Sequence, residues 1–380
     1  MKATFNLVSG MYVELEENDN QFVHVNHNQY EGSLVITSDY FGTGIPLYFV
    51  VENDLLYICD SLKVLKSMTK GKFVLNRSAL PIFIRYGFIP GEETLVSGVK
   101  KLPPMKKLVA IRGKGVEVLD DVKMDIDEMG KDLATSLETY YEDTMEKAVK
   151  DTMSQLQDGK RCCMALSGGF DSNALLYFAK NKLHVREVHA FSVGGVTGVD
   201  ETQTAKEITS FYEGVSFSKA MVSPQTLRHL DDIVDRLEGS VYERGIFLQY
   251  ELAKLVRDQG WKEMVLGECA DQVFNEKAYS LTCDSLALTY PKDYKFPACP
   301  YQMASYVVLP KNMLMLRPFG IRGLYPYLHK EVIGMASKTG MNKDFHKVQC
   351  MRALPVEVGS RLEKKGGARL CRVCSTRGSI

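Results

Sequence analysis

A glycine-rich turn near the middle of the chain has the residue types of a phosphate-binding loop. The turn, residues 167–172, reads Ser-Gly-Gly-Phe-Asp-Ser. The short apolar run before it, residues 161–166, predicts a buried parallel strand, and residues 173–180 after it have helical composition without a breaker. Backbone N–H groups in such a turn can converge on an anion at the positive end of the helix dipole. The turn therefore predicts a polyphosphate ligand.

The turn lacks the Gly-Lys-Ser/Thr of the common P-loop. It resembles instead the pyrophosphate loop (PP-loop) of the ATP pyrophosphatase superfamily, whose members attack ATP at the α-phosphate and release pyrophosphate. The resemblance implies that ATP is bound here. The residues expected to contact the nucleotide are Leu166, Ser167, Gly168, Gly169, Asp171, Ser172, Val193 and Gly267.

A second motif lies upstream of this turn. Residues 86–95, Tyr-Gly-Phe-Ile-Pro-Gly-Glu-Glu-Thr-Leu, are followed by Gly-Val-Lys-Lys-Leu-Pro-Pro at residues 98–104. This stretch resembles the end of the N-terminal domain in the asparagine synthetase and β-lactam synthetase-like family, where a similar pattern precedes the ATP domain. Two independent motifs in the family's order extend the resemblance over roughly residues 45–370.

The same resemblance implies a magnesium site. Residues 267–274 resemble the family's Gly-Glu-Gly-Ala-Asp-Glu-x-Phe loop, so that Asp171 and Asp271 would hold Mg²⁺ on the pyrophosphate, a common arrangement for this ion. Glu268 matches a family glutamate beside the acyl-adenylate, where it would orient the amine or accept its proton. Cys269 and Gln272 depart from the family's Gly and Glu, which leaves the shape of the pocket open.

Two further elements have more than one interpretation. Asp200-Glu201 matches acids that frame the family's nucleotide pocket, although acids in a helix's first turn are also ordinary dipole partners. Residues 361–366 resemble a family Arg-Pro-Lys-x-Gly element, whose lysine reaches the α-phosphate and stabilises the transition states. That alignment favours Lys364, with Lys365 one register away, and the alternative is a solvated turn.

A Cys-x-x-Cys pair close to the last residue, Cys371 and Cys374, is half of a zinc site. To complete it, the chain would have to supply Cys350, Cys299, Cys283 or His346. The alternative is a pair of free or redox-active thiols.

The segments around the first turn alternate between strands and helices. Strands are expected at residues 161–166, 188–193, 214–221 and 263–266, with helical segments between them. This pattern predicts an α/β fold with a doubly wound parallel sheet, and the resemblance implies the adenine nucleotide α-hydrolase-like, PP-loop type. Ligands in such sheets bind at the carboxyl ends of the strands, where Ser167, Val193 and Gly267 fall.

Short β-rich runs separated by turn residues fill residues 4–118, which predicts a smaller antiparallel β domain. We expect a boundary between residues 1–119 and residues 120–380. The resemblance implies a degenerate glutaminase-like domain of the N-terminal-nucleophile (Ntn) type. Glutamine-dependent members begin with a cysteine directly after the initiator Met, where this sequence has Lys2, and the domain is about half the usual length. Loss of glutamine hydrolysis is therefore expected.

Composition narrows the class of protein. The chain has 380 residues with 47 basic and 47 acidic side chains, so no overall basic field favours nucleic acid. No stretch approaches the ~18 apolar residues of a membrane span, and nine dispersed cysteines do not form a secreted disulfide pattern. A cytoplasmic protein with reduced thiols is expected, and a homodimer stays open.

The leading hypothesis is an ATP-dependent ligase that adenylates a carboxylate and transfers the acyl group to an amine or ammonia, with small-molecule or peptide substrates of a specialised pathway. A second hypothesis is a PP-loop enzyme that inserts sulfur through Cys162, Cys163, Cys269 or the terminal pair. Buried thiols in a strand are usually inert, which weighs against Cys162 and Cys163. Ammonia-dependent asparagine synthesis is a third hypothesis, and a nucleotide-binding scaffold without activity is a fourth.

Overall fold

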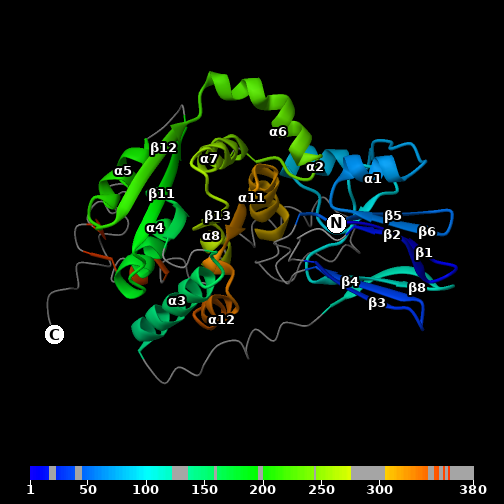
Figure 1. Ribbon diagram of the computed structural model, residues 1–380, viewed down its shortest axis with the longest axis horizontal. Helices are drawn as coiled ribbons and strands as arrows, with labels where there is room; N and C mark the ends of the chain where they lie inside the picture. The colour runs from blue at the N-terminus through cyan, green and yellow to red at the C-terminus, as the bar shows by residue number, and fades with distance from the viewer. Residues whose placement is uncertain are drawn as a thin grey trace. The chain divides into compact units, whose positions relative to one another are not determined.

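The computed structural model describes residues 1–16, 23–38, 45–121, 136–157, 161–195, 200–243, 245–274, 304–340, 346–350, 354–355 and 358–359 (Figure 1). The chain forms two compact units. The first comprises Met1–Met124, Leu230–Ile246 and Tyr279–Met315, and the second comprises Asp125–His229, Phe247–Ala278 and Leu316–Ile380. The boundary expected at residues 119 and 120 stays a prediction.

The second unit is built on a five-stranded sheet in the order β12-β11-β10-β13-β14, and every neighbouring pair is parallel. Its strands are β10 (Arg161–Ala165), β11 (Glu187–Gly194), β12 (Val215–Met221), β13 (Glu263–Val265) and β14 (Arg322–Leu324). The strand order reverses between β10 and β13, which is the topological switch point of a doubly wound sheet. The predicted fold class is confirmed, and β14 is an additional strand that the sequence pattern did not indicate.

Helices alternate with these strands along the chain. They are α3 (Leu137–Met153), α4 (Phe170–Tyr177), α5 (Glu201–Thr209), α7 (Ile246–Asp258), α8 (Ala270–Phe274) and α12 (Lys330–Lys338). α5 packs beside β11 and β12, whereas α7 packs its apolar face against Phe191, Met264 and Leu266 of the sheet region. α4 and α8 each begin directly after a four-residue turn that follows a strand, so their first turns lie at the sheet's carboxyl edge.

The first unit contains two antiparallel sheets. One has the order β2-β1-β6-β5-β7 and the other β3-β4-β8-β9. Their strands are β1 (Lys2–Asn6), β2 (Met11–Glu16), β3 (Val23–Asn28), β4 (Ser33–Ser38), β5 (Tyr48–Glu52), β6 (Leu55–Cys59), β7 (Lys100–Lys101), β8 (Lys106–Ile111) and β9 (Gly115–Asp120). Phe5 and Ile58 of the first sheet share one buried core with Ile36 and Leu108 of the second. The expected β-rich domain is therefore present as a two-sheet sandwich.

In its described residues, the first unit also contains α1 (Leu62–Met68), α2 (Leu80–Tyr86), α6 (Leu230–Leu237) and all but the last residue of α11 (Leu309–Leu316). The residue after α6, Glu238, caps the N-terminus of α1. Its carboxylate accepts hydrogen bonds from the Ser61 hydroxyl and the Leu62 backbone N–H, each at 2.6 Å. A charge-assisted cap of this kind satisfies orphan donors of the helix and attaches α6 to this unit.

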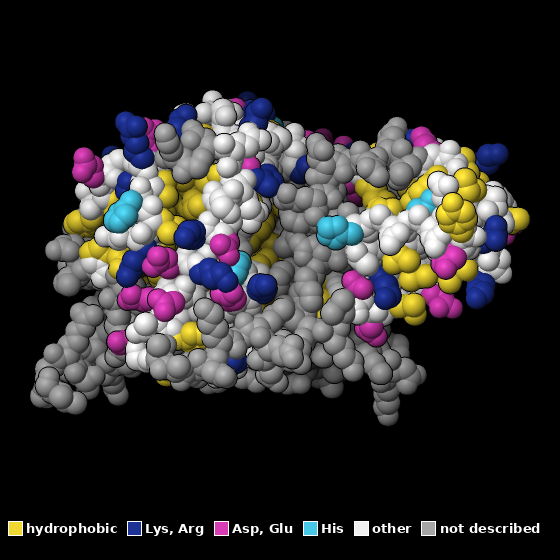
Figure 2. Space-filling view, turned by 60° about the horizontal axis from the view of Figure 1, so that its bottom comes forward, with side chains coloured by type: hydrophobic (Ala, Val, Ile, Leu, Met, Phe, Trp, Pro, Cys, Tyr) yellow, Lys and Arg dark blue, Asp and Glu magenta, His cyan; other side chains and the backbone are white. Residues whose placement is uncertain are grey.

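The face shown in Figure 2 carries Lys and Arg side chains interspersed with Asp and Glu side chains, in keeping with the equal numbers of both in the sequence. Of the helices in the described part of the chain, none is both long and apolar enough to cross a membrane.

Lys101 of β7 is a buried cation of the first unit. Its side chain donates a hydrogen bond to the Ile89 carbonyl, and its Nζ lies 5.4 Å from the centroid of the Tyr306 ring. Burial lowers the pKa of this amine to about 7, from 10.5. The amine of Lys101 therefore loses its proton at a lower pH in the folded state than in the unfolded chain.

We expect Lys101 to make stability depend on pH. Between about pH 7 and 10.5 the unfolded state binds more protons at this side chain than the folded state, so its destabilising effect decreases as pH rises. The difference in unfolding midpoint between Lys101→Met and the wild-type protein should therefore shrink across this range, followed by far-UV circular dichroism. A difference that stays constant with pH would contradict the lowered pKa.

Candidate nucleotide site

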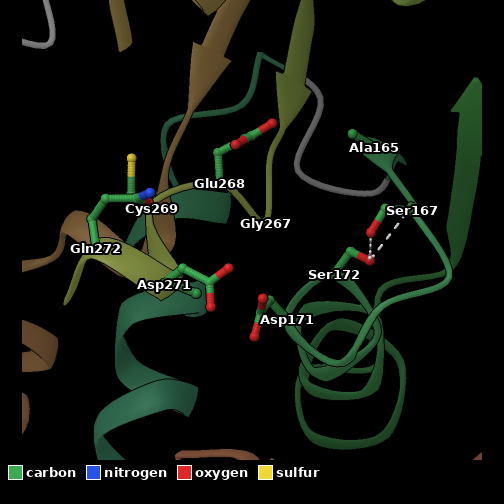
Figure 3. Close-up of a pocket in the computed structure, with 10 residues that line it drawn as sticks. Ala165, Ser167, Asp171, Ser172, Gly267, Glu268, Cys269, Asp271 and Gln272 are labelled. Atoms are coloured by element: carbon green, nitrogen blue, oxygen red, sulfur yellow. Dashed lines mark hydrogen bonds between the residues drawn. The ribbon is translucent and has the colours of Figure 1, made fainter. Parts of the chain in front are cut away.

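Two turns at the switch point line one pocket (Figure 3). The first turn, residues 166–169, connects β10 to α4, and the second turn, residues 266–269, connects β13 to α8. β10 and β13 are neighbours in the sheet, paired through Met164 and Val265. The pocket is lined by Ala165, Ser167, Asp171, Ser172, Gly267, Glu268, Cys269, Ala270, Asp271 and Gln272. Six of the predicted site residues therefore line the same pocket: Ser167, Asp171, Ser172, Gly267, Glu268 and Asp271.

The first turn requires glycine at residue 168. Gly168 has φ +68°, and a Cβ there would lie 2.8 Å from the Glu201 carbonyl oxygen. The Ser172 hydroxyl accepts a hydrogen bond from the Ser167 N–H at 3.1 Å, which folds the turn back onto the start of α4. The start of a helix at a tight turn is an environment that favours phosphate oxygens.

The second turn packs against the start of α4, the helix that follows the first turn. A Cβ on Gly267 would lie 2.9 Å from both the backbone nitrogen and the Cα of Ser172. Cys269 in the same turn has φ +75°, in the left-handed region that favours glycine, and its side chain is buried. The backbone therefore keeps the shape that the family's glycine would take, although the residue is a cysteine.

Three carboxylates line the pocket, and Figure 3 shows how they lie. Asp171, in the first turn of α4, and Asp271, in the first turn of α8, point toward the space between the two turns. Glu268 projects from the second turn toward the strand ends, away from the two aspartates. The pocket therefore offers a pair of oxygen ligands and a third acid set apart from them.

This donor set fits Mg²⁺. The described residues contain no group of three or more His, Cys, Asp or Glu side chains arranged to hold a metal by themselves. Mg²⁺ does not need such a group, because it is commonly held by one or two carboxylates together with substrate phosphates and water. Asp171 and Asp271 are the residues that would hold it.

Other predicted residues have definite places. Leu166 is buried and donates its N–H to the Phe191 carbonyl at 2.7 Å, and Val193 lies near the end of β11. Asp200 caps α5 by accepting from the Thr202 N–H at 3.0 Å, and the hydrogen bond from the Thr202 hydroxyl lowers the pKa of this carboxyl. That is the ordinary role of an acid at the start of a helix.

Several predicted residues lie outside the described residues: Lys364, Lys365, Cys371, Cys374, Cys283 and Cys299. The roles expected for the two lysines and the zinc site stay predictions. Cys350 and His346, two residues that could complete such a zinc site, are described and lie 3.7 Å apart between Sγ and Nε2. Both belong to a buried cluster behind Asp171.

That cluster has no counterpart among the sequence motifs. His346 is 1% exposed, and its Nε2 donates to Oδ1 of Asp171 at 2.9 Å. Burial by itself lowers the pKa of this imidazole, but Cys350 and Asp171 more than offset that effect and raise it to about 10. The Tyr327 hydroxyl donates to the backbone carbonyl of Asp171, also at 2.9 Å. Asp171 is therefore held at two points, its carboxylate and its backbone carbonyl.

A doubly wound parallel sheet with a glycine-dependent turn at its switch point places the second unit among nucleotide-binding α/β proteins. The asparagine synthase family model matches residues 141–339, which is 199 of the 380 residues. The chain belongs to the asparagine synthase family, whose enzymes are ATP-dependent ligases.

No curated protein matches the chain. Among solved structures, the chain is similar to the U34-tRNA thiolase NcsA from Methanococcus maripaludis with its [4Fe-4S] cluster, at 14% identity and a TM-score of 0.30. The match covers 63% of this chain and 80% of the thiolase chain.

The strained second turn yields a stability prediction. At φ +75° glycine is favoured over residues with a Cβ, so Cys269→Gly should be more stable than Cys269→Ala by ~1 kcal/mol. Both variants lack the thiol, so their difference isolates the backbone effect. Urea unfolding followed by the fluorescence of Trp261, the single tryptophan, reports on this unit. Equal midpoints would show that the left-handed conformation is not maintained.

Proposed function

We propose that the protein is an amide-forming ligase that adenylates a carboxylate with ATP, releases pyrophosphate and transfers the acyl group to an amine or ammonia. The observation that carries this proposal is the placement of Asp171 and Asp271 in one pocket, at the starts of the two helices that follow the glycine-dependent turns at the switch point. Membership in the asparagine synthase family supports the reaction class.

The first step would form the acyl-adenylate. A carboxylate oxygen of the acid attacks the α-phosphorus of ATP, and the bond to pyrophosphate breaks. The first turn and the N-terminus of α4 would bind the leaving pyrophosphate through backbone N–H groups. When bound to Asp171 and Asp271, Mg²⁺ would stabilise the negative charge on the pyrophosphate. Lys364 or Lys365 would stabilise the α-phosphate in the manner that the resemblance implies.

The second step would form the amide. The amine nitrogen attacks the acyl carbon, the bond between that carbon and AMP breaks, and the amine loses a proton. Glu268 lines the pocket and projects away from the proposed metal ligands, so its carboxylate is available to orient the amine or accept its proton. The acids therefore divide into a metal-binding pair and a base.

The amine would come from solution or from a second substrate. Glutamine hydrolysis by a cysteine nucleophile depends on an activated thiol, which needs a lowered pKa or an adjacent base. In the described part of the first unit, Cys59 is the free cysteine, and burial raises the pKa of its thiol. That environment opposes thiolate formation.

Sulfur insertion is less well supported. Cys162 and Cys163 are buried in β10, and burial raises the pKa of both thiols. Buried structural thiols of this kind are inert. Two of the candidates for a thiolation mechanism are therefore in unsuitable surroundings, and we favour the ligase.

The nucleotide product distinguishes these mechanisms. With ATP, Mg²⁺, ammonia and pools of carboxylic acids and amines, the wild-type protein should form AMP and pyrophosphate. Asp171→Asn should reduce this rate by about 100-fold or more, because it removes a metal ligand charge. Asp258→Asn is a matched control, since its side chain is half exposed and paired with Arg257. Formation of ADP and phosphate would refute adenylation.

The first turn offers a separate test of nucleotide binding. Gly168→Ala would push a methyl group to 2.8 Å from the Glu201 carbonyl and should weaken ATP binding by about 10-fold or more. Gly260→Ala is the control, because Gly260 has φ +79° but open space around the position of a Cβ. Isothermal titration with ATP and Mg²⁺ measures both. Equal losses in the two variants would mean that backbone strain, rather than the shape of the turn, is responsible.

A further inference from the structure

We propose that His346 is a positioning residue that fixes the Asp171 carboxylate, and with it the spacing of the two aspartates, for binding of the metal and nucleotide. This inference rests on the proposed function. It concerns a residue that does not line the pocket and therefore does not touch the substrates.

The hydrogen bonds of Asp171 with the described residues involve one carboxylate oxygen and the backbone carbonyl. Oδ1 accepts from Nε2 of His346 at 2.9 Å, and Oδ2 accepts no hydrogen bond from the described residues. The backbone carbonyl of Asp171 accepts from the Tyr327 hydroxyl at 2.9 Å. With Oδ1 and the backbone both held, rotation of the carboxylate is restricted, and Oδ2 is presented to a ligand.

His346 is itself tightly fixed. Its side chain is 2% exposed, and its Nδ1 lies 3.1 Å from the Tyr141 hydroxyl oxygen. The Tyr327 ring meets the imidazole edge-on, with centroids 5.5 Å apart and an angle of 89°. A side chain that hydrogen-bonds to a metal ligand orients that ligand only if its own rotamer is fixed. The contacts with Tyr141 and Tyr327 fix the rotamer of His346.

The imidazole also contacts the helix that carries the other aspartate. It stacks on Phe274 of α8, with ring centroids 4.2 Å apart and an angle of 4° between planes. Asp271 lies in the first turn of α8, three residues before Phe274. The imidazole of His346 thus hydrogen-bonds to Asp171 and packs on the helix that carries Asp271. Its position therefore sets the separation of the two carboxylates.

Metal binding without turnover tests the proposal. Mn²⁺ binding is measured by electron paramagnetic resonance in the presence of α,β-methylene-ATP, which cannot be cleaved at the α-phosphate. Loss of a group that orients a metal ligand commonly costs about 10–100-fold in metal affinity, and we expect this loss in His346→Leu. His346→Gln places an amide nitrogen near the position of Nε2 and should recover most of the affinity.

Cys350→Ala is the matched control. Cys350 is equally buried and lies 3.0 Å from the Tyr141 hydroxyl in the same cluster, whereas the hydrogen bond to the Asp171 carboxylate comes from His346. Cys350 also lies 3.7 Å from Nε2 of His346, but the contacts of the imidazole with Tyr141, Tyr327 and Phe274 remain in this variant. The proposal therefore expects near wild-type Mn²⁺ affinity, even where Trp261 fluorescence shows a comparable loss of stability. Equal loss of affinity in Cys350→Ala and His346→Leu would assign His346 a merely structural role and overturn the proposal.

Two further results would bear on the proposal. Tighter Mn²⁺ binding in both His346→Leu and His346→Gln would mean that repulsion between the imidazolium and the metal outweighs positioning, and the proposal would be wrong. If His346→Leu does not fold, Phe274→Leu keeps the hydrogen bond but removes the stacking, and should weaken Mn²⁺ binding. Wild-type affinity in Phe274→Leu would refute the coupling of the two aspartates.

The Mn²⁺-binding experiment and the nucleotide-product experiment test the two proposals separately. Loss of Mn²⁺ affinity in His346→Leu, together with a wild-type protein that forms no AMP, would leave the positioning role in place and refute the proposed reaction. Unchanged affinity, together with AMP and pyrophosphate formation by the wild-type protein, would refute the positioning role alone.

Discussion

The contact between Gly267 and Ser172 is the constraint on which the site depends. It leaves no room for a side chain on Gly267, since a Cβ would lie 2.9 Å from the backbone of Ser172. The close approach holds the turn after β13 against the start of α4, the helix that follows the neighbouring strand β10. Asp171 directly precedes Ser172, and Asp271 lies four residues after Gly267, so the same contact brings both carboxylates to one pocket.

The sequence predicted the parts of this site that are local in the chain. Each turn directly follows its own strand, and the glycines, serines and aspartates that line the pocket belong to these short segments. The parallel strands were recognisable because they are short apolar runs between helices. β14 was not, because three residues, Arg-Gly-Leu, show no periodicity and become a strand only by pairing with β13.

The support of Asp171 could not have been read from the sequence. His346 lies 175 residues from Asp171 in the chain, and Tyr327 lies 156 residues away, so no spacing rule connects them. A single histidine before Lys-Val-Gln-Cys suggested at most a metal ligand. Its actual environment follows from tertiary packing, which places a buried imidazole between a carboxylate and the ring of Phe274.

One segment of the first unit is inserted between strands of the second along the chain. In chain order, Leu230–Ile246 separates β12 from β13 of the other unit, yet this segment belongs to the first unit. Glu238 explains that membership, because its carboxylate caps α1 through the Ser61 hydroxyl and the Leu62 N–H. Deleting the sandwich together with α1 would leave the Glu238 carboxylate without these two hydrogen-bond donors, on a segment that joins two strands of the parallel sheet.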